Sequence, residues 1–490
     1  MNFKADWSFL DKVSMGAKAS KAVIDILNTS GHDVIELERY STRNKIWATK
    51  IKRLRMPDLI CLKCGKRIES RAKSKLDVRM SDNENNPNRR WDVGLRDEDL
   101  IAFIRCQKIE DEWIPADEIN LFETKSLRQT EDKSKLGPPK SAGEGAERDR
   151  IWKTTIPKAD GVITEIIPGS PKTKIRVEYT DNRRYTYSVE DSNGVYCDAM
   201  ERFKAYSTMI AGVPLKKENV SECSEEQYDF VQDLSSEKVE IRYAGVKALG
   251  YLSFESRYVD ALENLKNREE DTRIKLEIYS SLIRLGIDKW DEFYEYAMSI
   301  EDPQYCFEYV LILGELNSYE KANDTLCMIA KNYSFETEMR AASAWGIKVQ
   351  KSTLHDLIDI AQIDEPKVCA HAISHIIADY DDDLTDALIQ NETVSDKSGS
   401  IVLKILTEAE AVNPKTVVDI YLQLRDSLKR RWIAMSIGIG GKDRYGSYAR
   451  QLEEVDGSMY EFIKLLWDYK EHEISNNESS EIEFLLKQTL

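Results

Sequence analysis

The sequence predicts a multidomain protein: an N-terminal α/β domain, a small β-rich module and a C-terminal all-α array of repeats. Three observations support this prediction. The chain has 490 residues, which is enough for two to four cores at about 150 residues per domain. A polar stretch rich in Gly and Pro interrupts it near residue 140, and a helical pattern with a period of about 31 residues follows residue 225. We therefore expect domain boundaries at 1–128, 129–150, 151–215 and 222–490.

Residues 1–128 combine one helical pattern with several short apolar runs. Ala19, Val23 and Leu27 recur at helical spacing, and Ser30-Gly31 is a typical end for such a helix. Strand-like runs follow at 34–35, 58–62, 67–74 and 100–106. Together they predict a compact α/β domain.

Residues 129–150 are polar and almost free of large apolar side chains. Such a stretch buries too little surface to offset its ordering entropy, which predicts a flexible tether.

Residues 151–215 show the alternation of a small sheet or barrel. Ile175 and Val177 alternate with polar residues, as do Tyr185 and Tyr187, and a turn at 181–183 would bring both sets onto one face. A helix around 199–210 is expected to close this module.

From about residue 225 the pattern is helical and repeats. A basic or polar residue near a helix start recurs at steps of 31, 31, 36, 27, 30 and 33 residues, at Arg242, Arg273, Gln304, Arg340, Lys367, Lys397 and Arg430. Two short helices per unit cannot each bury an apolar face alone, so stacked units would share one core. The pattern resembles the HEAT-like repeats, whose second helix often opens with such a basic residue, and that resemblance implies an α-solenoid.

Composition limits the classes of function. The net charge of −17 excludes a wholly basic nucleic-acid coat, but it leaves room for a local basic patch. No apolar run approaches the ~20 residues of a membrane helix, and the first residues lack the apolar stretch of a signal peptide. The eight scattered cysteines are typical of reduced thiols. We therefore expect a soluble cytoplasmic protein with no membrane partner.

The positive charge is concentrated in one segment. Between Arg39 and Arg79 there are 14 basic residues and three acidic ones, a local net charge of +11. A solvated face is the ordinary explanation of a charge run, but this density in an acidic chain favours a surface for the phosphate backbone of DNA. The expected backbone contacts are Lys50, Lys52, Arg53 and Arg55.

Two carboxylates stand out inside this basic segment. Residues 56–73 read as two strands around Cys64-Gly65, and a two-residue loop there would pair Asp58 with Arg71 and Ile60 with Glu69. Asp58, Glu69, Arg71 and Lys73 would then project from one face. Two carboxylates close together could hold Mg²⁺ through hard oxygen ligands. The alternative is a salt bridge between these acids and Arg71 or Arg67 on an exposed sheet.

This arrangement resembles the PD-(D/E)xK nucleases, which have the restriction-endonuclease-like fold. In that family an Asp opens the second core strand and an acid-x-Lys follows on the third, after an N-terminal helix; Asp58 and Glu69-Ser70-Arg71 occupy those places. The resemblance covers about 110 residues. It implies that Asp58 and Glu69 bind Mg²⁺ or Mn²⁺ and that the chain hydrolyses phosphodiester bonds. Arg71 replaces the family lysine and cannot act as a base, so it would bind the phosphate while Lys73 orients the water.

The resulting hypothesis is a metal-dependent DNA endonuclease in prokaryotic, antiviral defence, whose acidic solenoid binds a protein partner or senses a trigger. Paired cuts on a duplex would favour a homo-oligomer. The main alternative is a non-enzymatic HEAT-like scaffold whose nuclease-like module only binds nucleic acid, because position 71 has lost the lysine. A third alternative is a solenoid that itself grips DNA.

Cys61 and Cys64 form half of a zinc-binding pattern. A structural Zn²⁺ needs four ligands, and the nearby candidates are His32 and Cys106, with no second Cys-x-x-Cys in the chain. Packing of two small residues in a hairpin is therefore the preferred interpretation, with Zn²⁺ as the alternative.

Overall fold

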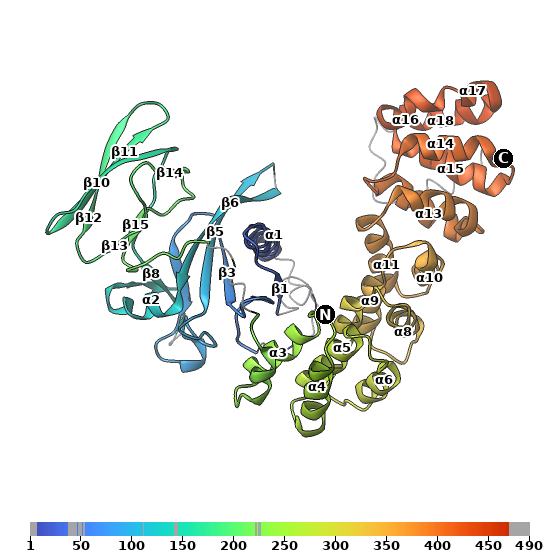
Figure 1. Cartoon of the computed structure of the whole chain (residues 1–490). Helices are drawn as coiled ribbons and strands as arrows, with labels where there is room; N and C mark the ends of the chain where they lie inside the picture. Colours follow the sequence, from blue (N-terminus) through green and yellow to red (C-terminus); the bar gives the residue numbers. More distant parts are fainter. Residues whose placement is uncertain are drawn as a thin grey trace. The chain divides into compact units, whose positions relative to one another are not determined.

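The computed structural model describes residues 7–37, 47, 51, 54–110, 112–141, 146–220, 223 and 227–469. A β-rich N-terminal region precedes an all-helical region, so the predicted multidomain layout is confirmed at that level (Figure 1). The chain divides into two compact units, Met1–Cys306 and Phe307–Leu490, and the division falls within α7 (Pro303–Glu315). Over the described ranges, no helix is both long enough and apolar enough to cross a membrane.

A mixed five-stranded sheet forms the centre of the N-terminal region. Its order is β1 (Val34–Glu36), β2 (Leu59–Cys61), β3 (Arg67–Lys73), β5 (Leu100–Ile109) and β6 (Glu112–Glu123). Strands β1, β2 and β3 form an antiparallel meander, β5 runs parallel to β3, and β6 returns antiparallel to β5. The short helix α2 (Thr124–Arg128) follows β6.

Helix α1 (Trp7–Thr29) covers one face of this sheet (Figure 1). Its apolar positions, including Val23 and Leu27, are buried against Ile68 and Ile104 of the sheet, as the helical spacing predicts. Gly31 follows the helix with a φ of +84°, a left-handed conformation that glycine adopts without steric cost. The helix predicted around residues 17–27 is therefore confirmed, and it begins earlier than the pattern indicates.

The tether predicted for 129–150 is wrong for most of the residues described there. Strands β7 (Lys135–Pro139) and β8 (Arg148–Trp152) form a three-stranded sheet with β4 (Val78–Asp82), in the order β4-β8-β7. The buried Arg150 forms an ion pair with Asp82, and Trp152 is completely buried. The polar composition does not indicate strand β8, because its charged residue Arg150 is neutralised by Asp82, which is distant in sequence. The boundaries expected at 128 and 150 thus fall within one folded region.

Residues 154–213, within the range 151–215 expected for it, form a small β module. Strands β10 (Gly161–Ile167), β11 (Lys172–Tyr179), β12 (Arg184–Glu190) and β14 (Arg202–Phe203) make one sheet, and β9 (Thr154–Thr155), β13 (Gly194–Val195) and β15 (Ala211–Gly212) make another. Ile175 pairs with Tyr187 and Val177 with Tyr185, so the shared face is confirmed. The helix predicted at 199–210 is wrong, because Met200 and Tyr206 have positive φ values that a right-handed helix does not allow.

Sixteen helices follow, a count that covers the described part of the chain. They begin with α3 (Val239–Leu249), α4 (Ser256–Arg268), α5 (Thr272–Arg284) and α6 (Trp290–Met298). After α7 come α8 (Glu320–Lys331), α9 (Thr337–Gly346), α10 (Lys351–Ala361), α11 (Pro366–Ala378), α12 (Thr385–Ala387), α13 (Asp396–Glu408), α14 (Pro414–Gln423), α15 (Ser427–Gly440), α16 (Lys442–Ala449), α17 (Leu452–Val455) and α18 (Gly457–Tyr469).

The repeat anchors occupy every second helix. The seven residues that define the sequence period lie near the starts of α3, α5, α7, α9, α11, α13 and α15. In the unit from Phe307, α9 packs against α11, α11 against α13, and α13 against α15. This region therefore has two helices per repeat, as the sequence period predicts.

Candidate functional site

The β2–β3 hairpin carries the residues for which the sequence predicts chemistry. Leu59 pairs with Ile68 and Ile60 with Arg67, which leaves a four-residue loop at 62–65. The two-residue loop at Cys64-Gly65 is therefore wrong. The hairpin closes earlier because the N–H of Cys61 donates to the carbonyl of Lys66 (2.9 Å), and that of Gly65 to the carbonyl of Cys61 (3.0 Å). The register shifts by two residues, and a shift of two keeps every side chain on its predicted face.

The corrected register brings Asp58 and Glu69 together. Asp58 directly precedes β2 and, by continuation of the register, lies opposite Glu69 of β3. One carboxylate oxygen of Asp58 accepts the backbone N–H of Ser70 at 2.9 Å, so this carboxylate lies against the backbone next to Glu69. Asp58 has no ion pair among the described residues. We refer to Asp58 and Glu69 as the acidic pair.

Arg71 adds a cation to the acidic pair. Its guanidinium lies 2.7 Å from Glu69 Oε1, and the Glu69 side chain is only 13% exposed. The Arg71 side chain is 40% exposed, although its Nε is buried without a hydrogen-bond partner among the described residues. Arg67, the other cation considered in the sequence, is instead buried against Asp99, with Nε donating to Oδ1 at 3.0 Å. Arg71, and not Arg67, is thus the cation observed to pair with Glu69.

Lys73 lies farther along β3 and has a different partner. Its ammonium donates to the carbonyl of Arg79 at 2.6 Å and lies 3.9 Å from Asp77. It is four positions from Glu69 along the strand, a span of ~13 Å between the two backbones. Burial lowers the pKa of Lys73 to about 8. The geometry therefore favours Arg71 over Lys73 as the cation at the acidic pair.

Of the expected phosphate contacts, only Arg55 lies within the described residues. It is exposed, with a φ of +57°, and its carbonyl approaches Gly94 so closely that a Cβ there would collide with it. Lys50, Lys52 and Arg53 lie outside the described residues.

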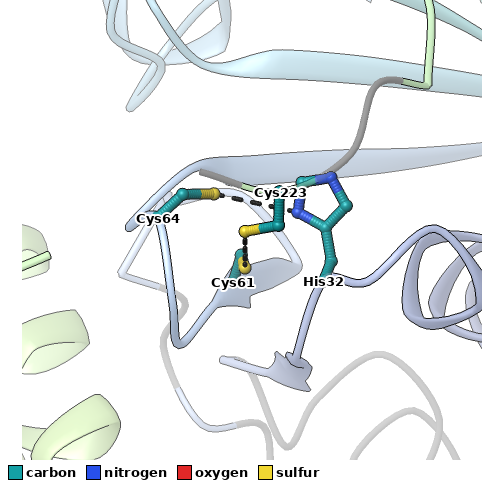
Figure 2. Close-up of side chains that lie close together, drawn as sticks. All are labelled: His32, Cys61, Cys64 and Cys223. Atoms are coloured by element: carbon teal, nitrogen blue, oxygen red, sulfur yellow. Dashed lines mark hydrogen bonds between the residues drawn. The ribbon is translucent and has the colours of Figure 1, made fainter. Parts of the chain in front are cut away.

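A second group of side chains gathers at the opposite end of the same hairpin. Figure 2 shows His32, from the loop after α1, beside Cys61 and Cys64 of the hairpin and Cys223, which precedes the helices. The sulfurs of Cys61 and Cys223 are 3.7 Å apart, and Cys64 Sγ lies 3.8 Å from His32 Nδ1. All four ligand atoms lie within 4.8 Å of one another. We call these four residues the Cys/His cluster.

The backbone around the Cys/His cluster is fixed by hydrogen bonds. Lys63 Nζ donates to the carbonyl of Gly31 at 2.7 Å, which ties the His32 loop to the hairpin. The N–H of Tyr228 donates to the carbonyl of Lys63 at 2.6 Å, and the Gln227 amide donates to that of Leu62 at 2.5 Å. The segments that carry the four side chains are therefore held side by side by contacts of their own.

The pKa values of the three thiols in the cluster are shifted in different directions. A hydrogen bond from the Cys64 thiol lowers the pKa of Cys61 to about 4, although burial opposes this effect. The same bond raises the pKa of Cys64, and burial raises that of Cys223. A thiolate is the form of cysteine that binds metal, and the pKa of Cys61 is shifted in that direction.

His32 belongs to the group, as the sequence suggests, but Cys106 does not. Cys106 lies in β5 in the core beneath α1, where burial raises its pKa to about 11. Cys223 takes the expected place of Cys106. It is 162 positions from Cys61 and lies in a polar stretch without a second cysteine nearby, so only the three-dimensional structure identifies it.

A comparison with protein-family models finds no match to this chain, and a comparison with curated protein sequences likewise finds none. The functional assignment therefore rests on the residues described above.

Proposed function

We propose that this chain is a metal-dependent nuclease that hydrolyses phosphodiester bonds of DNA. In this proposal the N-terminal region is a restriction-endonuclease-like domain and the helices form a HEAT-like solenoid that binds a protein partner. Prokaryotic defence against foreign DNA is the role that the family resemblance implies. The protein would act in the reducing cytoplasm, where its eight cysteines remain thiols.

The observation that carries the proposal is the position of the acidic pair in the sheet. Asp58 opens the second strand of a meander that follows a helix, Glu69 lies opposite it on the third strand, and a parallel strand comes next. This order of elements agrees with the one that the family resemblance implies. It also concentrates two carboxylates on a hairpin within the basic segment 39–79.

The residues present fit a hard divalent cation. Carboxylate oxygens are the ligands that Mg²⁺ and Mn²⁺ prefer, and Asp58 and Glu69 supply them. Bound there, the ion would lower the pKa of its water and neutralise charge on the phosphate. Arg71 would hold a phosphate oxygen through the exposed part of its guanidinium, while the oxygen of the attacking water bonds to phosphorus, the P–O bond to the leaving alcohol breaks and the alcohol takes up the proton that the water loses.

One contact favours a second candidate, the non-enzymatic scaffold. The ion pair between Glu69 and Arg71 neutralises one of the two carboxylates and uses the cation that would hold the phosphate. In this alternative the domain binds DNA without cutting it, and the solenoid provides the functional surface. The solenoid as the DNA-binding element remains a third candidate, which the acidity of that region disfavours.

Cleavage of plasmid and single-stranded DNA, with Mg²⁺ and then with Mn²⁺, tests the proposal. The parent chain should cut, Glu69→Gln should reduce the rate at least 100-fold, and Glu98→Gln should leave it unchanged, since Glu98 is 66% exposed outside the pair. Equal rates for the parent and Glu69→Gln would exclude the acidic pair as the site. Binding without cleavage by the parent would support the scaffold.

A further inference from the structure

We propose that the Cys/His cluster, His32, Cys61, Cys64 and Cys223, is a structural zinc site. It is separate from the acidic pair, and its existence does not depend on nuclease activity. The inference rests on the distances between the ligand atoms, on their chemical type and on the way the backbone presents them.

Two of the distances between ligand atoms are close to the edges of a zinc tetrahedron, and all four atoms lie within 4.8 Å of one another. With Zn–S bonds of about 2.3 Å and tetrahedral angles, neighbouring sulfurs lie about 3.8 Å apart, and a sulfur lies slightly closer to a ligating nitrogen. The observed separations are 3.7 Å between Cys61 and Cys223 and 3.8 Å between Cys64 and His32 Nδ1. A disulfide would bring two sulfurs to about 2.05 Å, so the cluster is not one.

The chemical types of the four ligands favour zinc over magnesium. Three thiols and an imidazole are soft or borderline donors, which suit Zn²⁺ and not the Mg²⁺ expected at the acidic pair. All four positions would be filled by protein side chains, and this leaves no place for a water or substrate. Such closed sites are structural, whereas catalytic zinc sites keep one position open.

The local backbone has the shape that such a site needs. The four-residue loop 62–65 lets Cys61 and Cys64 both point to the cluster, and Gly65 has a φ of +69°. A Cβ on Gly65 would lie 2.4 Å from the ring of Tyr228, so the close approach of that segment requires glycine. Tyr228 in turn is tied to the hairpin, because its N–H donates to the carbonyl of Lys63.

The site would join three segments that are distant in sequence. It connects the loop after α1, the β2–β3 hairpin and the stretch that precedes α3. Because the hairpin also carries the acidic pair, zinc would fix the strands on which Asp58 and Glu69 lie.

Zinc content of the purified full-length chain is the primary measurement. The parent and the matched control Cys369→Ser should each contain one zinc per chain, because Cys369 is a free thiol outside the cluster. Cys223→Ser should lose at least nine-tenths of the metal. Cys223→His, which retains four ligands, should recover it and would show that loss in the serine variant is not simply misfolding.

Two further readouts identify the ligands and guard against adventitious metal. Replacement by Co²⁺ should give the visible bands of a tetrahedral site with a sulfur-to-cobalt charge-transfer band, and Cys223→Ser should weaken both. Removal of zinc by 1,10-phenanthroline, compared with the non-chelating 1,7 isomer, should lower the melting temperature. A parent without zinc, or equal zinc in Cys223→Ser and the parent, would overturn the proposal. Neither measurement depends on cleavage, so failure of the nuclease proposal would be recognised separately.

Discussion

At the residue scale, the role of the contact between Glu69 and Arg71 decides between the two proposed functions, nuclease and scaffold. Arginine stays protonated at any physiological pH, so Arg71 can bind a phosphate but cannot accept a proton from water. A lysine at this position would carry the same charge on an ammonium group, which is smaller than a guanidinium and could lose its proton.

Arg71→Lys is therefore expected to raise cleavage by about 10²-fold if the acidic pair binds metal, since a positioned proton acceptor contributes roughly 10²–10⁴-fold. Single-turnover cleavage of a labelled duplex measures this gain, with Arg105→Lys as the control. No gain in a chain that still binds DNA would indicate that the acidic pair does not bind a catalytic metal.

Lys73 makes a pH-dependent contribution to stability. Burial lowers its folded pKa to about 8 from an ordinary value of 10.5, so the buried charge costs roughly 3 kcal/mol below pH 8. This cost disappears as the pH rises from about 8 towards 10.5, because the folded state then loses its proton first. The parent should gain in melting temperature between pH 7 and 9.5, and Lys73→Met should gain less.

The exposed Lys75 provides the control for this experiment. Lys75→Met should keep the parental pH dependence. The assignment to Lys73 would be wrong if both methionine variants lost the gain equally.

At the element scale, the repeat anchor Arg242 connects two neighbouring helix pairs. Arg242 of α3 reaches Glu269, which precedes α5, through a two-pronged ion pair of 2.8 and 3.0 Å. Glu269 also accepts the N–H of Glu270 and of Asp271, and Asp271 caps α5. The buried carboxylate of Glu269 thus holds the start of α3 to the start of α5.

Glu269→Gln should weaken this junction by about 1.5–3 kcal/mol, the usual value of a hydrogen bond to a charged group. Amides of α3 and α5 should then exchange hydrogen about 10- to 100-fold faster at pH 7, measured by mass spectrometry. Glu270→Gln, at an exposed position, is the control and should exchange as the parent does.

The effect should also depend on pH. Burial alone would raise the pKa of Glu269, but hydrogen bonds from Arg242 and from the backbone outweigh it and lower the pKa below 4.5. The stabilisation is therefore complete above pH 4.5 and is lost as the pH falls through the folded pKa. The difference between parent and variant should shrink at acidic pH; an unchanged difference would show that the charge is not responsible.

Elements with a strong local pattern could be predicted from the sequence, and elements defined by distant partners could not. The spacing of Val23 and Leu27 identified α1, and the alternation at Ile175 identified the β11–β12 hairpin. Strand β8 was missed because the acidic partners that allow Arg150 to be buried, Asp82 among them, lie 19 to 68 positions away in sequence. At the site, the acidic pair could be proposed from its own segment, whereas Cys223 has no local signal that links it to Cys61.

At the scale of the whole molecule, the two units differ in charge. Residues 307–490 contain 32 acidic and 19 basic side chains, a net charge of −13 out of the total of −17. The basic segment 39–79 belongs to the other unit. If the chain binds a polyanion, as proposed above, this charge distribution makes the basic segment the expected place of contact.

Binding to DNA should depend steeply on salt through the basic segment. Each lost phosphate contact reduces the slope of log K against log salt by ~0.9, so removal of three contacts should reduce it by roughly 2.7. The variant changes Lys50, Lys52 and Arg53 to Gln, and the control changes the exposed Lys404, Lys415 and Lys442 to Gln. A fluorescence anisotropy titration at several salt concentrations measures both. Equal slopes for the two variants would show that the segment does not bind the DNA backbone.

The distance along the chain between Cys61 and Cys223 has a consequence for biosynthesis. These residues are 162 positions apart, and a ribosome adding ~5–20 residues per second takes roughly 8–30 s to cover that interval. Throughout this time His32, Cys61 and Cys64 have been made, but their fourth neighbour has not. A nascent chain would therefore carry three of the four ligands, open to the wrong metal or to oxidation, until the stretch that contains Cys223 leaves the ribosome. The supply of zinc during translation, and not only after it, would then determine what fraction of the protein folds with zinc at this site.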